Sequence, residues 1–257
     1  MLEVFILLII VGLAAGLLGS IIGVGGGIIM SPALTFLGYS PAQAASTSLI
    51  AITSSSVSST LSYAKFRKIK FNLGLKMAAF SIPGAILGAF ISTDISPLYF
   101  KTGFAILLFF SAFYILFKRT IIDKRTIIDN KLEYTSKWTK VFFYSSLLIA
   151  GFISSLFGIG GGIVFVPLLI IVMGQSMSNA VPNSQFTLMI TSIIGTMTHI
   201  FLGNPEYIQA LALALGSFGG AQVGSRISLR LGENTLRVIL AVSFIGIGLK
   251  FIHDMAS

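Results

Sequence analysis

The sequence contains no cysteine among its 257 residues. Disulfide bonds, thiolate catalysis and cysteine-ligated metals are therefore excluded from its chemistry. Charge is scarce as well, since only 10% of the residues are Asp, Glu, Lys or Arg, whereas 55% are hydrophobic and the mean hydropathy is +0.96. Soluble domains carry about 25% charged residues, so this balance indicates an integral membrane protein.

Acidic residues are missing from the interior of every long apolar run. All eight lie in loops or near the expected helix ends: Glu3, Asp94, Asp123, Asp129, Glu133, Glu206, Glu233 and Asp254. No membrane-embedded carboxylate is therefore available for a proton relay or a cation site. Catalytic triads and metal-ligand clusters are missing too, and the GVGGG stretch lacks the lysine and the spacing of a phosphate-binding loop. We therefore expect no enzyme activity, no bound metal and no cofactor.

Apolar runs of membrane-spanning length recur along the chain. A helix needs about 20 apolar residues to cross the bilayer core, and shorter pieces suffice where a helix is broken. The runs cover residues 3–22, 43–63, 72–92, 97–117, 141–158, 180–202, 207–225 and 234–252. They predict an all-α polytopic protein of the plasma membrane, with the lipid bilayer as a partner. The first run is longer than a signal-peptide core, so we expect it to be retained.

The two halves of the chain repeat each other. Residues 16–32 read GLLGSIIGVGGGIIMSP and align without a gap on residues 151–167, GFISSLFGIGGGIVFVP. A fixed internal match of this kind is typical of a tandem duplication. We therefore predict a first transmembrane repeat at residues 1–117 and a second at residues 141–257. Between them, residues 118–140 form a polar linker with seven basic residues.

Basic residues predict the orientation in the membrane. The loop KFRKIK at residues 65–70 and the linker are both strongly basic and two spans apart, so the positive-inside rule places both in the cytoplasm. The same rule places residues 226–237 inside and the GNPE loop at residues 203–206 outside. The net charge of +9 thus lies mostly in short loops between apolar helices, and we expect no nucleic-acid binding.

This orientation predicts how the glycine segments cross the membrane. Residues 140 and 176 fall on one side, so the segment between them must enter and leave by the same face. Residues 1–40 likewise begin and end outside. We therefore predict two inverted-topology repeats, each with a glycine-broken short-helix hairpin followed by three spanning helices. Two short crossings in place of each hairpin, and a parallel arrangement of the repeats, stay open as alternatives.

The duplicated glycine runs are the predicted binding site. Glycine destabilises a helix interior by about 1 kcal/mol relative to alanine, so three glycines in an apolar stretch indicate a broken helix. The short helix after each break points free amides and a positive dipole end into the membrane, which favours an anion. We expect one central anion to be bound by Gly25, Gly26, Gly27, Gly160, Gly161 and Gly162. Other glycines are expected to pack helices closely, namely Gly84, Gly88, Gly220 and Gly224.

Hydroxyl and amide side chains gather in the helix that follows each break. Such groups donate hydrogen bonds to an oxyanion without adding charge. Most of them are expected to bond their own backbone or to join helices. Those nearest the breaks are predicted to complete the anion site: Thr47, Ser48, Asn183, Ser184 and Gln185. For His199, close to the outer end of its helix, a local structural role and proton coupling both stay open.

The paired motifs GVGGGIIMSP and GIGGGIVFVP, the AST at residues 45–47 with Ser48, and the basic loop after that helix resemble those of the TauE/SafE family of sulfite and organosulfur anion exporters. The resemblance covers nearly the whole chain. It implies transport of a small sulfur oxyanion or organosulfonate, such as sulfite or sulfoacetate, across the plasma membrane. The second half departs from the first at residues 182–184, PNS, so the two sides of a site would differ.

The leading function is therefore export of a small anion. A negative cell interior drives anions outward by about 2.3 kcal/mol per charge per 100 mV, so export requires no coupling ion. An anion channel is one alternative. A membrane assembly or regulatory component that transports nothing, with glycines that only pack helices, is another. A homo-oligomer is compatible with the sequence.

Overall fold

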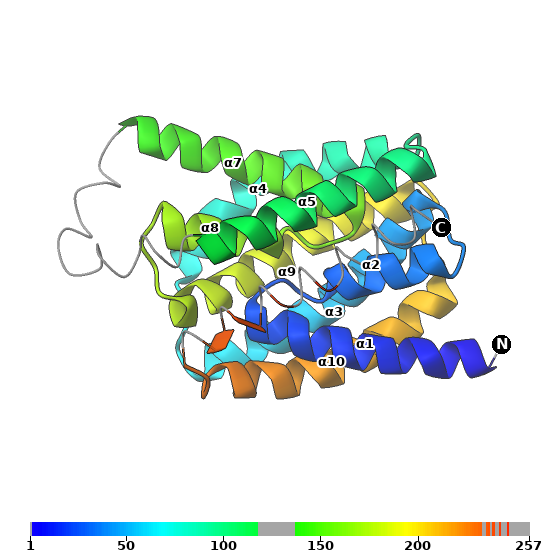
Figure 1. The fold of residues 1–257 in the computed structure, drawn as a ribbon, viewed down its shortest axis with the longest axis horizontal. Coiled ribbons are helices and arrows are strands. Elements are labelled where there is room, and N and C mark those ends of the chain that lie inside the picture. The colour runs from blue at the N-terminus through cyan, green and yellow to red at the C-terminus, as the bar shows by residue number, and fades with distance from the viewer. Residues whose placement is uncertain are drawn as a thin grey trace.

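The computed structural model describes residues 2–117 and 137–232, together with residues 235, 236, 238, 239, 242 and 246. Within these ranges every regular element is a helix (Figure 1). The first half contains α1 (Leu2–Ile22), α2 (Gly27–Phe36), α3 (Pro41–Lys65), α4 (Phe71–Ser92) and α5 (Pro97–Phe117). The second half contains α7 (Lys137–Phe157), α8 (Gly162–Ile171), α9 (Met177–Phe201) and α10 (Tyr207–Ser228).

Helix lengths repeat between the two halves. α1 and α7 have 21 residues each, α2 and α8 have 10, α3 and α9 have 25, and α4 and α10 have 22. Most of the predicted linker, residues 118–136, lies outside the described residues. Its last four residues belong to α7, which begins at Lys137 rather than at residue 141. The prediction differs because it counted only the apolar part of this helix. The predicted last span at residues 234–252 also lies mostly outside them.

The outside of the described fold is apolar, and its inside contains many hydroxyls among apolar side chains. Large apolar side chains face outward along the helices, for example Leu13 (48% exposed), Leu87 (53%) and Leu215 (58%). Hydroxyl side chains such as Ser55 and Ser217 are buried between helices instead. A broad apolar exterior, with hydroxyls buried beside apolar side chains, suits a protein surrounded by lipid.

Some of the described helices have the length and the composition of a membrane span. Among the described helices, α1 and α4 are long and apolar enough to cross a bilayer, whereas α2 and α8 are apolar but too short to do so. The helices α3 and α9 are longer, but many serine and threonine residues lower their hydropathy.

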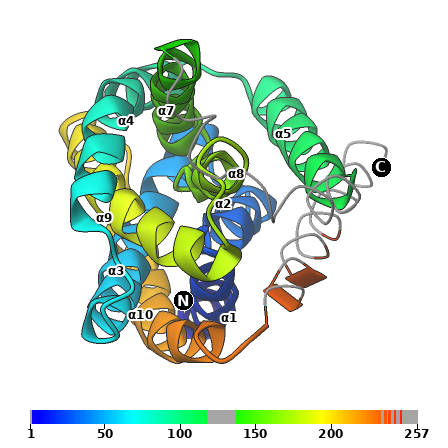
Figure 2. The same cartoon turned by 90° about the vertical axis from the view of Figure 1, so that its left-hand side faces the viewer.

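The two short helices lie at the centre of the molecule. In the end view of Figure 2, α2 and α8 are surrounded by α1, α10, α3, α9, α4 and α7, with α5 on the remaining side. In Figure 1 the same two helices extend toward opposite ends of the molecule. The segments that were predicted to be broken are thus the most enclosed part of the fold.

The outer helices pack through glycine, as predicted. A Cβ atom placed on Gly84 or Gly88 of α4 would collide with backbone atoms of α7, at Leu148 and Phe152 respectively. A Cβ atom on Gly220 or Gly224 of α10 would collide in the same way with backbone oxygens of α1. These glycines therefore bring helix backbones together, and their packing role is confirmed.

The helices α3 and α9 run antiparallel, as two reciprocal hydrogen bonds show. At one end, the Lys70 amide before α4 donates to Asn183 Oδ1 near the start of α9, at 2.7 Å. At the other end, the Glu206 amide before α10 donates to Thr47 Oγ1 near the start of α3, at 3.0 Å. Each of these side chains therefore accepts a hydrogen bond from the residue directly before a helix of the other half.

Candidate functional site

Both predicted helix breaks are present. α1 ends at Ile22 and α2 begins at Gly27, while α7 ends at Phe157 and α8 begins at Gly162. The residues that precede the short helices, Gly26 and Gly161, have φ angles of 84° and 60°. An L-residue with a side chain rarely adopts this left-handed conformation, which explains why glycine stands at both positions.

The two breaks are in direct contact with each other. A Cβ atom placed on Gly27 would lie 2.5 Å from the carbonyl oxygen of Gly158 and 2.6 Å from that of Ile159. A Cβ atom placed on Gly162 would lie against Gly23 and Val24 in the reciprocal manner. The backbones can approach this closely only because neither residue has a side chain. The structure thus brings together the two predicted glycine runs, each of which ends in the first residue of a short helix, Gly27 or Gly162.

Free amides lie at the start of both short helices. The first regular bond of α2 runs from the Ile29 amide to the Gly26 oxygen at 3.0 Å, and none of the hydrogen bonds in the described part of the chain uses the N–H of Gly26, Gly27 or Ile28. At α8, the Gly162 amide bonds the Gly160 oxygen at 2.6 Å and the Val164 amide bonds the Gly161 oxygen at 2.9 Å. None of the hydrogen bonds in the described ranges uses the N–H of Gly161 or Ile163, so these two amides are the free ones at α8. Unpaired amides at two helix starts provide hydrogen-bond donors and positive dipole ends in one place.

Side chains from other helices satisfy the carbonyl groups of the first break. Ser55 Oγ donates to the Gly25 oxygen at 2.9 Å, and Ser184 Oγ donates to the Gly23 oxygen at 2.7 Å. Gln185 Nε2 donates to the Gly19 oxygen at 2.9 Å. Two predicted donors of the anion site, Ser184 and Gln185, thus lie at the break and bond its backbone in this structure.

The second break has fewer such partners. Ser31 Oγ donates to the Phe157 oxygen at 2.7 Å. Ser48, which is the counterpart of Ser184 in the first half, is fully buried, and its Oγ has no hydrogen-bond partner. Gln185 Oε1 is buried without a partner as well. A buried polar atom without a partner is costly, so such atoms mark places where water or a ligand can bind.

Thr47 and Asn183 differ from the other predicted site residues. Thr47 accepts a hydrogen bond from the Glu206 amide, and Asn183 accepts one from the Lys70 amide. Asn183 Nδ2 also donates to the Asn179 oxygen at 2.9 Å. Both side chains therefore join helix ends. The sequence pattern could not separate this role from ligand binding, because a polar side chain near a break fits both.

His199 and its counterpart in the first half of the chain bond equivalent carbonyl oxygens. His199 Nε2 lies 3.1 Å from the Ser155 oxygen in the last turn of α7. The counterpart of His199 in the first half is Tyr63, whose hydroxyl donates to the Ser20 oxygen at 2.8 Å in the last turn of α1. Ser20 and Ser155 are aligned residues of the duplicated segment. Both side chains thus satisfy a carbonyl that the helix end leaves unpaired; Tyr63 was not among the predicted site residues.

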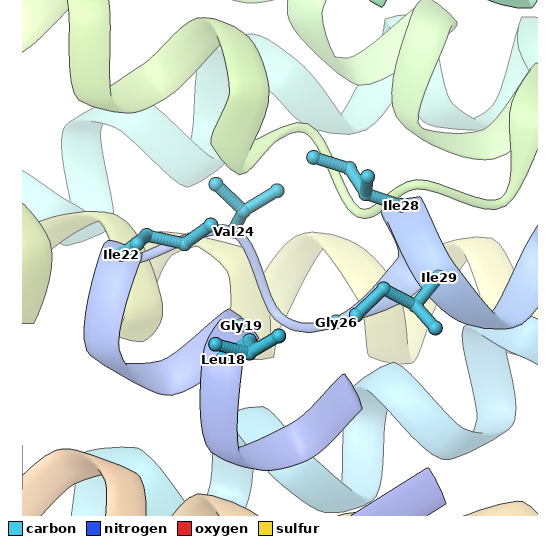
Figure 3. A pocket seen from close by; sticks show the side chains of 7 residues that line it. All are labelled: Leu18, Gly19, Ile22, Val24, Gly26, Ile28 and Ile29. Carbon is cyan, nitrogen blue, oxygen red and sulfur yellow. The ribbon is translucent and has the colours of Figure 1, made fainter. Parts of the chain in front are cut away.

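Apolar side chains cover the space in front of the breaks. Ile52 of α3 and Leu188 of α9 both contact Gly25 and Gly160 and are fully buried. A second apolar feature is the pocket of Figure 3, which lies between the end of α1 and the start of α2 and has no charged or polar side chain in its lining. Its residues are Leu18, Gly19, Ile22, Val24, Gly26, Ile28 and Ile29. An oxyanion therefore finds no side-chain donor in that pocket.

Sequence reasoning missed Ile52 and Leu188. The available signal was their equivalence in the repeat, since each lies four residues after a predicted site residue, Ser48 or Ser184.

Metal binding finds no support in the part of the chain that the structure describes, where no group of three His, Asp or Glu residues could hold an ion.

Comparison with known proteins places this architecture in a family. The model of the family "Sulfite exporter TauE/SafE" matches residues 8–251. The probable membrane transporter protein YunE of Bacillus subtilis is 31% identical, with 97% of this chain and 98% of the relative covered. The probable membrane transporter protein MJ0441 of Methanocaldococcus jannaschii is also 31% identical, with 94% and 92% covered. No solved structure gives a significant match.

These matches define the class of protein as an α-helical membrane transporter. The chain belongs to the TauE/SafE sulfite exporter family.

Proposed function

We propose that this protein exports small sulfur-containing anions, such as sulfite or sulfoacetate, across the plasma membrane through a site at the two glycine breaks. The observation that carries the proposal is the meeting of the starts of α2 and α8, where Gly27 lies against Gly158 and Gly162 against Gly23. Unpaired amides at two helix N-termini suit an oxyanion, because both hydrogen bonding and the helix dipoles favour negative charge there.

The side chains around the breaks support an anion rather than a cation. In the described part of the chain, the groups that reach the breaks are hydroxyls, the Gln185 amide and apolar side chains. The acidic residues of that part, Glu3, Asp94 and Glu206, lie at or beyond helix ends instead. Ser48 Oγ is free to donate to a bound oxyanion. Ser184 and Gln185 can exchange their backbone partners for it. Neutral donors bind an anion weakly enough to release it.

Two inverted repeats belong to the same proposal. The antiparallel course of α3 and α9 and the reciprocal contacts of the two breaks support this arrangement, in which substrate binds at the repeat interface near the midplane. The basic residues 65–70 and the linker at residues 118–140 then lie in the cytoplasm. Export follows the membrane potential, which favours exit of anions from a negative interior.

Reconstitution in liposomes tests the function. Vesicles with purified protein are loaded with sulfite, and efflux is followed under an imposed potential, with sulfoacetate, thiosulfate and chloride compared in parallel. We expect saturable sulfite efflux that an inside-negative potential accelerates. No efflux of any sulfur anion from folded protein would contradict the proposal and leave the glycines a packing role.

Variants connect the flux to the breaks. Gly161→Leu places a side chain at the start of α8, and Ser48→Ala removes a hydroxyl that has no partner in the fold. We expect both to reduce sulfite efflux by at least tenfold. Gly219→Leu on α10 is the matched control, because a Cβ atom there meets nothing within 4 Å. If folded Ser48→Ala and Gly161→Leu proteins export sulfite at the wild-type rate, the anion does not bind at the breaks.

A further inference from the structure

Ile52 and Leu188 meet at the centre of the molecule. A Cβ atom placed on Gly25 would lie 2.9 Å from Leu188 Cδ2 and 3.0 Å from Ile52 Cγ2. A Cβ atom placed on Gly160 would lie 2.9 Å from Ile52 Cγ2 and 3.2 Å from Leu188 Cδ1. Each of the two side chains thus touches both breaks. With Leu49 they form a small apolar cluster of fully buried residues, separate from the larger apolar clusters of the described fold.

Buried hydroxyls flank this apolar pair along both helices. On α3, Ser48 precedes Ile52 by one helical turn and Ser55 follows it by one turn. On α9, Ser184 and Thr191 stand in the same relation to Leu188. All four hydroxyl residues are buried. Since residues three and four apart share one side of a helix, each helix has an apolar residue in the middle of a hydroxyl-bearing face.

The hydroxyl face of α3 continues beyond the pair toward the end of the helix. Ser59 and Ser62 follow Ser55 at helical spacing, and both are buried with an Oγ that has no hydrogen-bond partner. Ser48 Oγ, on the other side of Ile52, has no partner either. Buried hydroxyls without partners in the protein are expected to contact water or a polar solute. The unpartnered groups therefore lie on both sides of Ile52.

We propose that Ile52 and Leu188 form an apolar gate over the two glycine breaks, which separates two polar half-pathways and which an anion must displace to reach the backbone amides. The gate rests on the proposed function of the breaks and deepens it, because it names the residues that limit entry. Two packed apolar side chains leave no polar partner for water, and an unhydrated constriction is a high barrier to an ion.

The gate also selects substrate by size. Ile52 Cδ1 lies 2.5 Å from the position of a Cβ atom on Gly27, so this side chain covers three of the predicted glycines. The space that opens when the two side chains turn away therefore limits the anion that can follow. Truncation of either side chain to alanine is expected to admit larger organosulfonates and to let small anions leak.

Chloride leak measures the gate directly. The probes are chloride, sulfite and sulfoacetate, and the proteins are wild type, Ile52→Ala, Leu188→Ala and the double variant, each in liposomes. We expect each single variant to raise chloride flux at least tenfold and to raise sulfoacetate flux relative to sulfite. Leu34→Ala is the control, because Leu34 is equally buried but belongs to a different apolar cluster, formed by α1, α2, α3 and α10. Its chloride flux should equal that of wild type.

A pair of isosteric variants keeps the test decisive if the alanine variants do not fold. Ile52→Val and Ile52→Thr give side chains of the same shape that differ in one hydroxyl. The gate predicts at least tenfold more chloride leak through the threonine variant, because a hydroxyl hydrates the constriction, and little change through the valine variant. Equal leak through folded valine and threonine proteins would overturn the gate.

The outcomes separate the gate from the proposed function. If wild type exports no sulfur anion but the Ile52→Thr protein conducts chloride, the gate stands and the substrate assignment fails. If wild type exports sulfite and the Ile52 and Leu188 variants neither leak chloride nor change the ratio of sulfoacetate to sulfite flux, the function stands and the gate is wrong. If neither wild type nor any folded variant conducts, both are wrong.

Discussion

His199 Nε2 lies 3.1 Å from the carbonyl oxygen of Ser155. Because a carbonyl oxygen only accepts hydrogen bonds, this nitrogen carries the hydrogen. In the first half of the chain, the Tyr63 hydroxyl donates to the Ser20 oxygen. A phenol at the end of α1 and an imidazole at the end of α7 thus both donate to a carbonyl oxygen of the last helical turn. Of the two roles expected from the sequence, local structure and proton coupling, this equivalence favours the first.

Substitution of His199 should therefore affect stability before transport. We expect His199→Ala to destabilise the protein by about 1–3 kcal/mol, because the Ser155 oxygen loses its buried donor. His199→Gln, which can still donate, should restore much of this loss and leave the pH profile of sulfite efflux unchanged. Thermal unfolding and flux between pH 5.5 and 8.5 check both statements. A folded His199→Gln protein without the wild-type pH dependence would assign proton coupling to this residue.

Ser184 and Ser48 give a matched comparison between the repeats. Ser184→Ala removes the donor to the Gly23 oxygen and should cost about 1–3 kcal/mol of stability. Ser48→Ala removes an Oγ without a partner and should change stability little, but it should raise the KM for sulfite efflux. Unfolding curves and flux against sulfite concentration separate the two effects. The same stability loss in both variants, with the KM of Ser48→Ala equal to that of the wild type, would mean that Ser48 has only a packing role.

Gly26 and Gly38 separate backbone strain from close contact. Both have positive φ angles, 84° and 89°, and alanine in this conformation costs about 1–2 kcal/mol. A Cβ atom on Gly38 meets nothing within 4 Å, whereas one on Gly26 would lie 2.5 Å from the Ala15 oxygen. We therefore expect Gly26→Ala to lose about 1–3 kcal/mol more than Gly38→Ala. Equal losses in unfolding experiments would show that the α1–α2 junction relaxes around the new methyl group.

The orientation can be tested with single cysteines, since the natural chain has none. Lys68, in the basic loop after α3, and Thr93, after α4, are both exposed. We expect a membrane-impermeant thiol reagent applied to intact cells to label Thr93→Cys and to spare Lys68→Cys until the membrane is opened. The reverse pattern would invert the proposed topology, and labelling of both from outside would contradict it altogether.

The glycine breaks could be predicted from the sequence because the cost of glycine in a helix is local and the duplication shows it twice. The packing role of Gly84 and Gly220 could also be predicted, because each is followed by a second glycine four residues later on the same helix face. The partners of the hydroxyls could not be predicted in this way. Ser184 and Ser48 are equivalent in the repeat, yet one bonds the Gly23 oxygen and the other bonds nothing, because hydrogen bonds depend on distances between helices.

Ile52 and Leu188 show a second limit of sequence reasoning. An apolar residue in an apolar run carries no signal of its own, so the sequence pattern singles out only the polar residues beside it. Only the packing of α3 and α9 across the breaks shows that both side chains lie over Gly25 and Gly160. Asn183 and Thr47 show the converse, since their polarity suggested a ligand while their contacts are with helix ends.

A crosslink between the repeats distinguishes a carrier from a channel. Thr53 Oγ1 of α3 lies 3.3 Å from Thr196 Oγ1 of α9, and both residues are half-buried. Cysteines at these two positions should form a disulfide under mild oxidation, because side-chain atoms this close can reach the bond length of about 2.05 Å. The absence of natural cysteine leaves no competing thiol.

Alternating access moves one repeat against the other, so the crosslink should stop a carrier. We expect oxidation of the Thr53→Cys, Thr196→Cys double variant to lower sulfite efflux at least tenfold, and a reductant to restore it. The two single variants, treated with the same oxidant, should keep their flux. Full efflux through a protein that is crosslinked quantitatively would mean that anions pass without relative movement of α3 and α9, as they do through a channel.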